Sequence, residues 1–144
     1  MFKIIPFFLV LVLSCSTPKS ATLKTSFQTI YTSAYGGEDR SGSLHITTNE
    51  DFIKLIEKLK IDESEFNTLA TIDFKENDIV VLYQGQKMSG GYAIDVESVS
   101  WENDILIIKK AEKSPAKGAM VTMALTSPYC ITSIPKTKEI KIIQ

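Results

Sequence analysis

The sequence predicts an α+β domain, in which a mostly antiparallel sheet or partial barrel of short strands packs with one amphipathic helix at about residues 49–60. Two observations support this fold class. Short runs rich in apolar and β-branched residues recur between turn signals, as in antiparallel β-proteins. One segment instead repeats its apolar side chains at helical spacing. We expect the helix to pack on the sheet, because neither element can bury its apolar side alone.

The N-terminus has the features of an exported lipoprotein. Lys3 precedes an apolar run of ten residues, Ile4 to Leu13. This is the length of a signal-peptide core, whereas a transmembrane helix needs about 20 apolar residues. The residues Val-Leu-Ser before Cys15 resemble the bacterial lipobox, which implies cleavage before Cys15 and acylation of that cysteine. An ordinary signal peptide with a chance cysteine is the alternative.

These features divide the chain into three parts: a lipoprotein signal peptide at residues 1–14, a flexible tether at 15–26 that starts at the acylated cysteine, and a single domain at 27–144. Removal of the signal peptide leaves 144 − 14 = 130 residues, the size of one domain. Several acyl chains, palmitate among them, would anchor the protein stably to a membrane. We therefore expect it in the bacterial cell envelope. The tether has no acidic run, which favours the periplasm-facing side over surface display.

The first elements of the domain are two strands, in "FQTIYTS" and "LHITT", separated by a glycine-containing loop. The helix follows. Thr48 or Asn49 can cap it, and the acidic residues Glu50 and Asp51 suit its positive end. Its apolar side chains recur at i, i+3, i+4 and i+7, which forms one stripe for the core: Phe52, Leu55, Ile56 and Leu59.

The second half of the domain contains most of the predicted strands. The apolar run in "DIVVLYQG" indicates a strand covered on both faces. In "GYAIDVESVSW" the apolar positions change parity, which predicts a β-bulge near Ser98. Residues 102–104 form a hairpin turn, "ILIIKKA" is the returning strand and "SPAKG" turns the chain again. We expect the last strands in "MVTMALT", "SPYCITSI" and "IKIIQ".

The inventory of reactive side chains argues against an enzyme. Apart from Cys15, the chain has one cysteine, Cys130, and one histidine, His45. We expect Cys130 to be a small buried apolar residue and His45 to point to solvent from a strand. No metal-ligand cluster, phosphate loop or nucleophile motif is present in the sequence. We therefore expect no catalytic residue, metal or cofactor, and no small-molecule substrate. With one arginine and a net charge of −1, nucleic acid is not expected as a partner.

Two tyrosine motifs are the candidate functional features. One is Gly90, Gly91 and Tyr92; the other is Ser127, Pro128 and Tyr129. In one interpretation, "KMSGGY" and "TSPY" meet at one end of the sheet and form a docking edge for a protein, since tyrosine is favoured at interfaces. In the other, the tyrosines brace the ends of hairpins and the glycines only turn the chain. The sequence is compatible with a cis or a trans peptide bond between Ser127 and Pro128.

These motifs also belong to a wider pattern: an Asp-Phe before an apolar strand, a glycine at the end of that strand, Gly-Tyr with an aliphatic residue two later, a Pro-to-Gly turn and a closing Ser-Pro-Tyr. The residues are Asp73, Phe74, Gly85, Gly91, Tyr92, Ile94, Pro115, Gly118, Ser127, Pro128 and Tyr129. Across about residues 73–136 the chain resembles the C-terminal domain of PrcB-type protease-complex subunits. The resemblance implies an exported accessory domain. The family's namesake associates with a subtilisin-like surface protease, and no catalytic residue carries over.

The sequence therefore predicts a membrane-anchored lipoprotein that acts as a non-catalytic accessory or protein-binding domain, as a subunit of a protease complex. Its partners would be the membrane, through the lipid, and an exported protease or another envelope protein. Two alternatives stay open. One is a structural envelope lipoprotein without a discrete partner. The other is a loop that binds proteases in the manner of chagasin-like inhibitors, which the Gly-Tyr dipeptide resembles.

Overall fold

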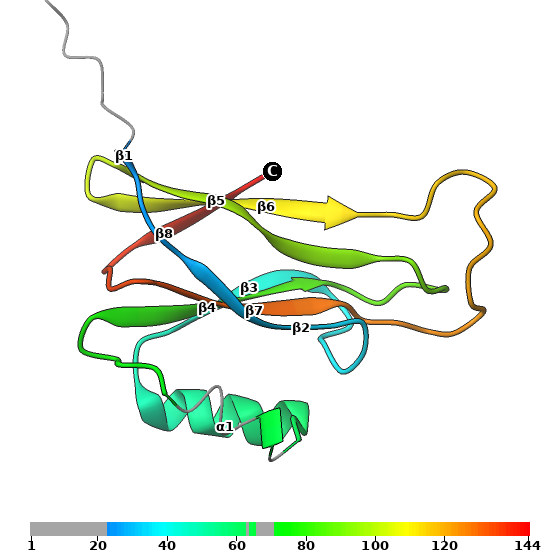
Figure 1. The fold of residues 1–144 in the computed structure, drawn as a ribbon, viewed down its shortest axis with the longest axis horizontal. Coiled ribbons are helices and arrows are strands. Elements are labelled where there is room, and N and C mark those ends of the chain that lie inside the picture. Colours follow the sequence, from blue (N-terminus) through cyan, green and yellow to red (C-terminus); the bar gives the residue numbers. More distant parts are fainter. Residues whose placement is uncertain (1–22, 63, 66–70) are drawn as a thin grey trace, which may run out of the picture.

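The structure is a computed structural model that describes residues 23–62, 64–65 and 71–144. The predicted signal peptide and Cys15 lie outside the described residues. Two sheets and one long helix make up the fold (Figure 1). The elements in chain order are β1 (Leu23–Lys24), β2 (Gln28–Ser33), β3 (Ser41–Ile46), α1 (Asn49–Leu59), β4 (Asn77–Gln84), β5 (Ala93–Glu102), β6 (Ile105–Lys113), β7 (Tyr129–Pro135) and β8 (Ile140–Ile143).

The two four-stranded sheets pack face to face, and α1 covers the outer face of one of them (Figure 1). The strand orders are β1-β5-β6-β8 and β2-β7-β4-β3. All pairs are antiparallel except β6 and β8, which are parallel. The fold class is thus α+β with mostly antiparallel sheets, as the sequence predicts. The sheets form a sandwich with a helix as a third layer.

Helix α1 has the caps and the buried stripe that the sequence predicts. The Thr48 hydroxyl accepts a hydrogen bond from the Asp51 N–H at 3.2 Å, which satisfies a donor that the first turn leaves free. The helix ends where Lys60 adopts the left-handed conformation, with φ 53°. Phe52, Leu55 and Ile56 are buried. The apolar stripe therefore packs α1 on the sheet.

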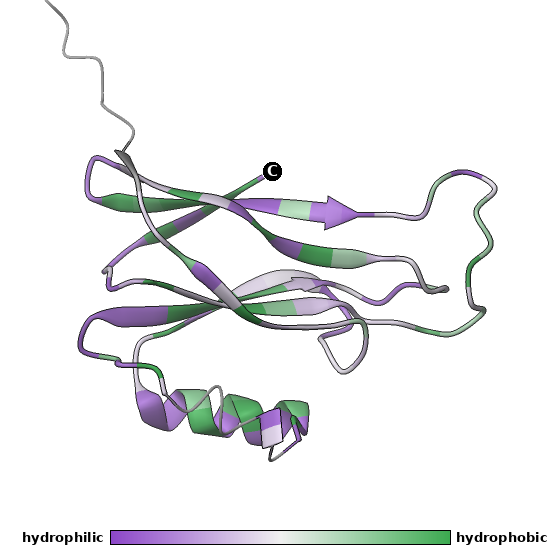
Figure 2. Cartoon of the chain, in the orientation of Figure 1, coloured by the Kyte–Doolittle hydropathy of each residue, from purple (hydrophilic) through white to green (hydrophobic). Residues whose placement is uncertain are grey.

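Strand β4 is covered on both faces, as its unbroken apolar run predicts. Ile79, Val81 and Tyr83 face the helix, and Val80 and Leu82 face the other sheet. Each face has its own core. The helix-side core contains Ile46, Phe52, Leu55, Ile56, Ile79, Val81, Tyr83, Tyr129 and Ile131. The inter-sheet core contains Val80, Leu82, Ile94, Val96, Val99, Leu106, Ile108, Cys130 and Ile134. Figure 2 shows the apolar stretches of these strands within the layers.

The β5–β6 hairpin confirms the predicted bulge and turn. The register between the strands shifts between Val96 and Ser98. The extra residue lets Ile94, Val96 and Val99 all enter the inter-sheet core. At the turn, Asn103 and Asp104 have φ of 48° and 65°, the left-handed conformations that a tight two-residue hairpin loop requires.

The expected strand at residues 120–126 is wrong. This part of the chain is a loop, joined to residues 87–90 by an isolated bridge between Lys87 and Thr126 and by a bond from the Gly90 N–H to the Thr122 carbonyl. Alternating apolar residues form a strand only if a sheet covers one side of them. Here Met120 and Met123 are almost fully exposed, so these side chains do not pack against a core.

The expected solvent position of His45 is also wrong. Its Nε2 lies 3.2 Å from Oδ2 of Asp78, a carboxylate with no exposed surface. Asp78 also accepts hydrogen bonds from the Lys136 ammonium and the Thr137 N–H. The alternation of apolar residues predicts that His45 lies on the face of the strand opposite to Leu44 and Ile46. It does not reveal that the second sheet covers this face. His45 is therefore half-buried and helps to hold β3 on β4.

Candidate functional site

The two tyrosine motifs lie in segments that meet at one end of the sandwich. Residues 85–92 follow β4, and residues 114–128 form the long connection from β6 to β7 (Figure 1). Lys87 and Thr126 exchange backbone hydrogen bonds of 2.7 and 3.0 Å. The Thr126 hydroxyl donates to the Ser89 carbonyl at 2.9 Å. We call the two segments together the loop end of the sandwich.

Gly90 and Gly91 are required by this close approach. The Gly90 N–H donates to the Thr122 carbonyl at 3.0 Å, and a Cβ at Gly90 would lie 2.4 Å from the Thr122 hydroxyl oxygen. Gly91 has φ +87°, and a Cβ there would lie 3.1 Å from Pro115. A side chain at either position would push the segments apart. The glycine pair therefore has a structural role in joining them.

Tyr92 lies beside these glycines and is half-buried. The Lys87 ammonium lies 5.5 Å from the centroid of the Tyr92 ring, within the range of a cation–π interaction. Part of the ring is accessible at the loop end. Tyr92 is thus the one aromatic residue of the two motifs that a partner can reach.

Ser127 and Pro128 connect the loop end to the neighbouring strands. The Ser127 N–H donates to the Ala34 carbonyl at 2.9 Å, and the Ser127 carbonyl accepts from Gly37 at 3.0 Å. The Pro128 carbonyl accepts from the Gln84 N–H at 2.9 Å. No cis peptide bond occurs in the described part of the chain, so the bond before Pro128 is trans. These contacts hold the start of β7 in place.

Tyr129 belongs to the helix-side core and is unavailable to a partner. Its side chain is 2% exposed, and its ring centroid lies 5.9 Å from that of Tyr31 and 6.2 Å from that of Tyr83. Burial raises the pKa of the Tyr129 hydroxyl well above the usual range. The structure brings the two motifs to the same end, but it places their two tyrosines in different environments.

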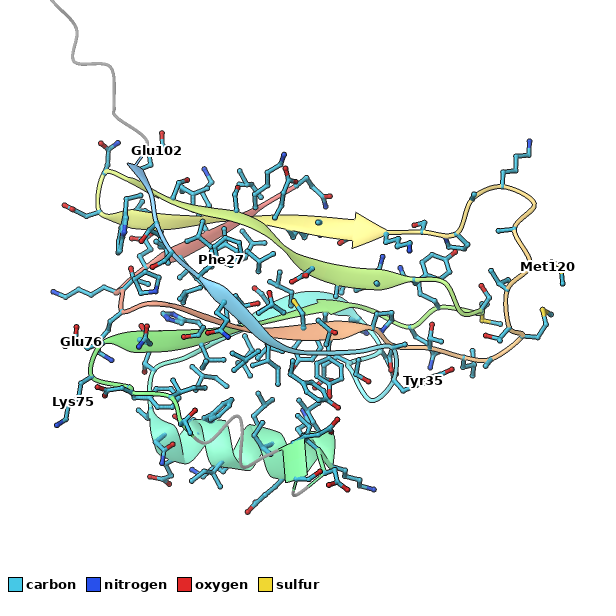
Figure 3. The ribbon with its side chains drawn as sticks, viewed as in Figure 1. Phe27, Tyr35, Lys75, Glu76, Glu102 and Met120 are labelled. Atoms are coloured by element: carbon cyan, nitrogen blue, oxygen red, sulfur yellow. The ribbon has the colours of Figure 1, made fainter. Side chains whose placement is uncertain are left out.

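The apolar side chains that are exposed at the loop end were not singled out by the sequence motifs. Met88, Met120 and Met123 are 79%, 101% and 94% exposed, and Leu125 is also exposed. Figure 3 shows Met120 at the far tip of the connection, remote from both cores. In the sequence, residues 120–126 alternate between apolar and other side chains and contain two methionines and no acidic residue. This pattern predicts a strand, so it did not mark these side chains as exposed. Methionine is common at adaptable binding surfaces.

The cysteine and the histidine of the described chain lie in different parts of the fold. Cys130 is fully buried between the sheets, and burial raises its thiol pKa to about 12. His45 lies on β3, two strands away from β7, and contacts Asp78. Within residues 23–62, 64–65 and 71–144, no group of three or more His, Cys, Asp or Glu side chains could hold a metal ion. No helix in that same part of the chain is long and apolar enough to cross a membrane.

Comparison with protein families finds a match to the family model described as PrcB C-terminal, over residues 79–135. No curated protein and no solved structure matches the chain. The matched region runs from β4 through β7 and includes Gly90, Gly91, Tyr92 and the Ser-Pro-Tyr motif. The matched span therefore covers the whole loop end as well as the four strands that build the inter-sheet core. Residues 79–135 of this chain are therefore similar to the PrcB C-terminal family.

Proposed function

We propose that this protein is a lipid-anchored lipoprotein of the bacterial cell envelope, in which the loop end acts as a non-catalytic docking surface for another exported protein. The observation that carries the docking role is the exposure of four large apolar side chains in one place: Met88, Met120, Met123 and Leu125. Exposed apolar groups that gather together are typical of protein interaction sites.

The rigid frame below these side chains supports the same role. Backbone hydrogen bonds between Lys87 and Thr126, and between Gly90 and Thr122, hold the two segments together. Binding is less costly when the surface is ordered in advance. The glycine pair thus contributes indirectly, because it permits the segments to approach.

The charges suggest the chemistry of the partner. Residues 85–92 and 114–128 contain Lys87 and Lys117 and no acidic residue. An acidic rim around an apolar patch would complement this end, since complementary charges steer association. The family resemblance favours an exported protease as the partner.

The non-catalytic role is supported by the position of the reactive side chains. The Cys130 thiol is buried and its pKa is raised, so it is neither accessible nor ionised at neutral pH. The only histidine is held by Asp78. The lipid anchor is supported by the lipobox-like sequence before Cys15.

Crosslinking in intact cells tests the docking role. A photoreactive amino acid at Met120 should give a discrete crosslinked protein, identified by mass spectrometry, and Tyr92→Ala should weaken that crosslink. The matched control places the same group at Glu57, on the exposed side of α1, where no product is expected. Equal products from both positions, or none from Met120, would contradict the proposal.

The anchor has its own test. Wild-type protein should incorporate labelled palmitate and fractionate with membranes, and its processing should be sensitive to globomycin. Cys15→Ala should lose the label and leave the membrane. A Cys15→Ala protein that still fractionates with membranes would exclude a lipid anchor at this residue.

A further inference from the structure

Strand β3 is a free sheet edge that lacks the usual protection. Among residues 23–62, 64–65 and 71–144, it is the last strand of the sheet β2-β7-β4-β3 and pairs only with β4. Its sequence, Ser-Gly-Ser-Leu-His-Ile, has no lysine or proline, and its register with β4 runs without a shift. Natural proteins normally block an edge of this kind with charges, proline or a bulge, because its unpaired backbone groups can bind another strand.

The register identifies the backbone groups that face outward. The Gln84 N–H donates to the Pro128 carbonyl. In an antiparallel sheet, successive residues of a central strand form their backbone hydrogen bonds alternately with the strand on one side and the strand on the other. Gln84 and every second residue before it therefore bond to β7, whereas Tyr83 and Val81 bond to β3. Their partners on β3 are Gly42 and Leu44. The N–H and C=O groups of the intervening Ser41, Ser43 and His45 therefore point to the free edge.

Two grooves flank this edge, one on each face of the sheet. The helix-side groove has a volume of about 670 Å³ and runs between β3 and α1, with Leu44, Leu55 and Tyr83 among its walls. The second groove has a volume of about 280 Å³ and lies between β3 and β8, with Ile142 and Ile143 among its walls. Leu44 and Ile143 are exposed large apolar residues, so each groove offers an uncovered apolar contact.

The grooves match the geometry of an added strand. Successive side chains of a strand point to opposite faces of the sheet. A residue paired with Ser43 would direct its side chain to the β8 side, and its neighbours would direct theirs to the α1 side. We propose that β3 docks an extended, apolar segment of a partner protein, which adds as an antiparallel strand and places alternate side chains in the two grooves.

The lining residues distinguish this occupant from a second copy of the chain. Antiparallel pairing of two β3 strands about Ser43 would place Ser41, Ser43 and His45 of the second copy on the β8 side and Gly42 and Leu44 on the α1 side. Three of these five positions carry side chains too small to fill the grooves. A segment with larger apolar side chains fits better. The helix-side groove contains three acidic and three basic residues, several of them ion-paired with one another, so charge balance favours a segment without net charge.

This inference rests on the proposed protein-binding function but assigns a separate surface to it. The experiment uses purified full-length chain in detergent and a panel of capped synthetic peptides of about eight residues, near the common strand length. The peptides carry Val, Ile or Phe on one face, on both faces or in scrambled order. Peptides that are apolar on both faces should bind best. Failure here would leave the Met120 crosslink unaffected, so the two proposals can fail independently.

Substitution at Ser43 tests the binding mode. Proline is tolerated where an edge N–H faces away from the sheet, so Ser43→Pro should retain the β3–β4 ladder and reduce peptide affinity at least about tenfold, through lost strand hydrogen bonds. Ser43→Ala keeps the N–H and should bind like the wild type. Equal affinity for the Pro variant and the wild type, with both folded by circular dichroism, would overturn the proposal.

Two further measurements keep the test decisive if Ser43→Pro unfolds. Gly42→Val adds a side chain to the groove where a Cβ would meet nothing within 4 Å; it should fold normally and bind peptide more weakly. In hydrogen exchange, bound peptide should protect the Ser43 amide, whereas the Leu44 amide, bonded to β4, should be protected in both states. Absence of binding by every peptide, or a wild-type dimer that Ser43→Pro converts to a monomer, would also overturn the proposal.

Discussion

The two lateral sides of the sandwich, where the edge strands lie, are constructed in opposite ways. On one side the chain itself joins the sheets: β1 pairs with β5, the Thr25 N–H continues that pairing to Val99, and the chain then crosses to pair with β7 as β2 (Figure 1). Phe27, at the crossing, packs against the inter-sheet core (Figure 3). On the other side, β3 and β8 end their sheets with a groove between them.

The edges of a single sheet show the same contrast. The β2 edge has a register shift between Thr29 and Tyr31, and the Thr29 hydroxyl donates to Asp95 on β5 at 2.6 Å. The β3 edge has neither feature. A bulge and a link to the second sheet protect an edge from pairing with other chains. The difference indicates that one side of the molecule is closed for stability while the other is available for binding.

Among the substitutions, the largest expected effect comes from removing the buried carboxylate that holds the open edge. Asp78 contacts His45 of β3 as well as Lys136 and Thr137 beyond β7. Asp78→Ala should lower the free energy of unfolding by about 3 kcal/mol, because it leaves the groups that contact this carboxylate without their acceptor. Urea denaturation measures the change. Asp78→Asn, which keeps an acceptor, should cost less; a loss below about 1 kcal/mol for the alanine variant would show that the edge does not depend on Asp78.

The second effect tests the closed side. Phe27→Ala should lower the free energy of unfolding by about 2 kcal/mol, less than for a fully buried phenylalanine because Phe27 is only partly buried. Thermal denaturation and urea denaturation both report it. If Phe27→Ala lowers the free energy of unfolding no more than substitution of an exposed apolar residue does, the crossing contributes little to joining the sheets.

Alkaline pH should weaken both cores. Burial raises the pKa of Cys130, between the sheets, from 9.0 to about 12, and that of Tyr83, beside the helix-side groove, from 10.0 to about 12. The unfolded chain loses these protons first, so stability is intact below about pH 9. It falls as the pH rises from 9.0 toward 12 for Cys130 and from 10.0 toward 12 for Tyr83, by up to about 1.4 kcal/mol per pH unit for each group. Urea titrations between these pH values should show the loss, and Cys130→Ala should reduce the slope. An unchanged slope in that variant would contradict the assignment to Cys130.

The smallest effect on stability is expected on the open side. Leu44 is 42% exposed, so Leu44→Ala should change the free energy of unfolding by less than about 0.5 kcal/mol. It should nevertheless weaken the binding of apolar peptides, because it removes a wall of the helix-side groove. Peptide titration by fluorescence anisotropy, beside a urea denaturation curve, separates the two effects. Large destabilisation would mean that this side is part of the core.

Several parts of the fold were predictable because their signals are local. The cap at Thr48 and the apolar stripe of α1 depend on residues a few positions apart. The shift of apolar parity near Ser98 specified the bulge. The apolar run of β4 indicated two covered faces, and the structure shows the helix on one and a sheet on the other.

The errors arose where the environment of a segment depends on distant residues. Residues 120–126 alternate like a strand, but their backbone hydrogen bonds to Lys87 and Gly90 form no continuous ladder, and Met120 and Met123 are exposed. For the candidate site, the sequence marked Tyr92 and Tyr129 equally, although one lies at the surface and the other in the core. The apolar side chains of the loop end were visible in the sequence, but their exposure was not.

The sequence was enough to predict the helix, most of the strands, the scarcity of reactive groups and the resemblance to the PrcB C-terminal family across about residues 73–136. These features depend on residue identity and short spacing. The sequence did not predict that two sheets stack, that Asp78 and His45 meet, that Gly90 leaves room for Thr122 or that β3 is an edge strand between two grooves. Those outcomes depend on which strands pair, and pairing across many residues is set by the packing of the whole core.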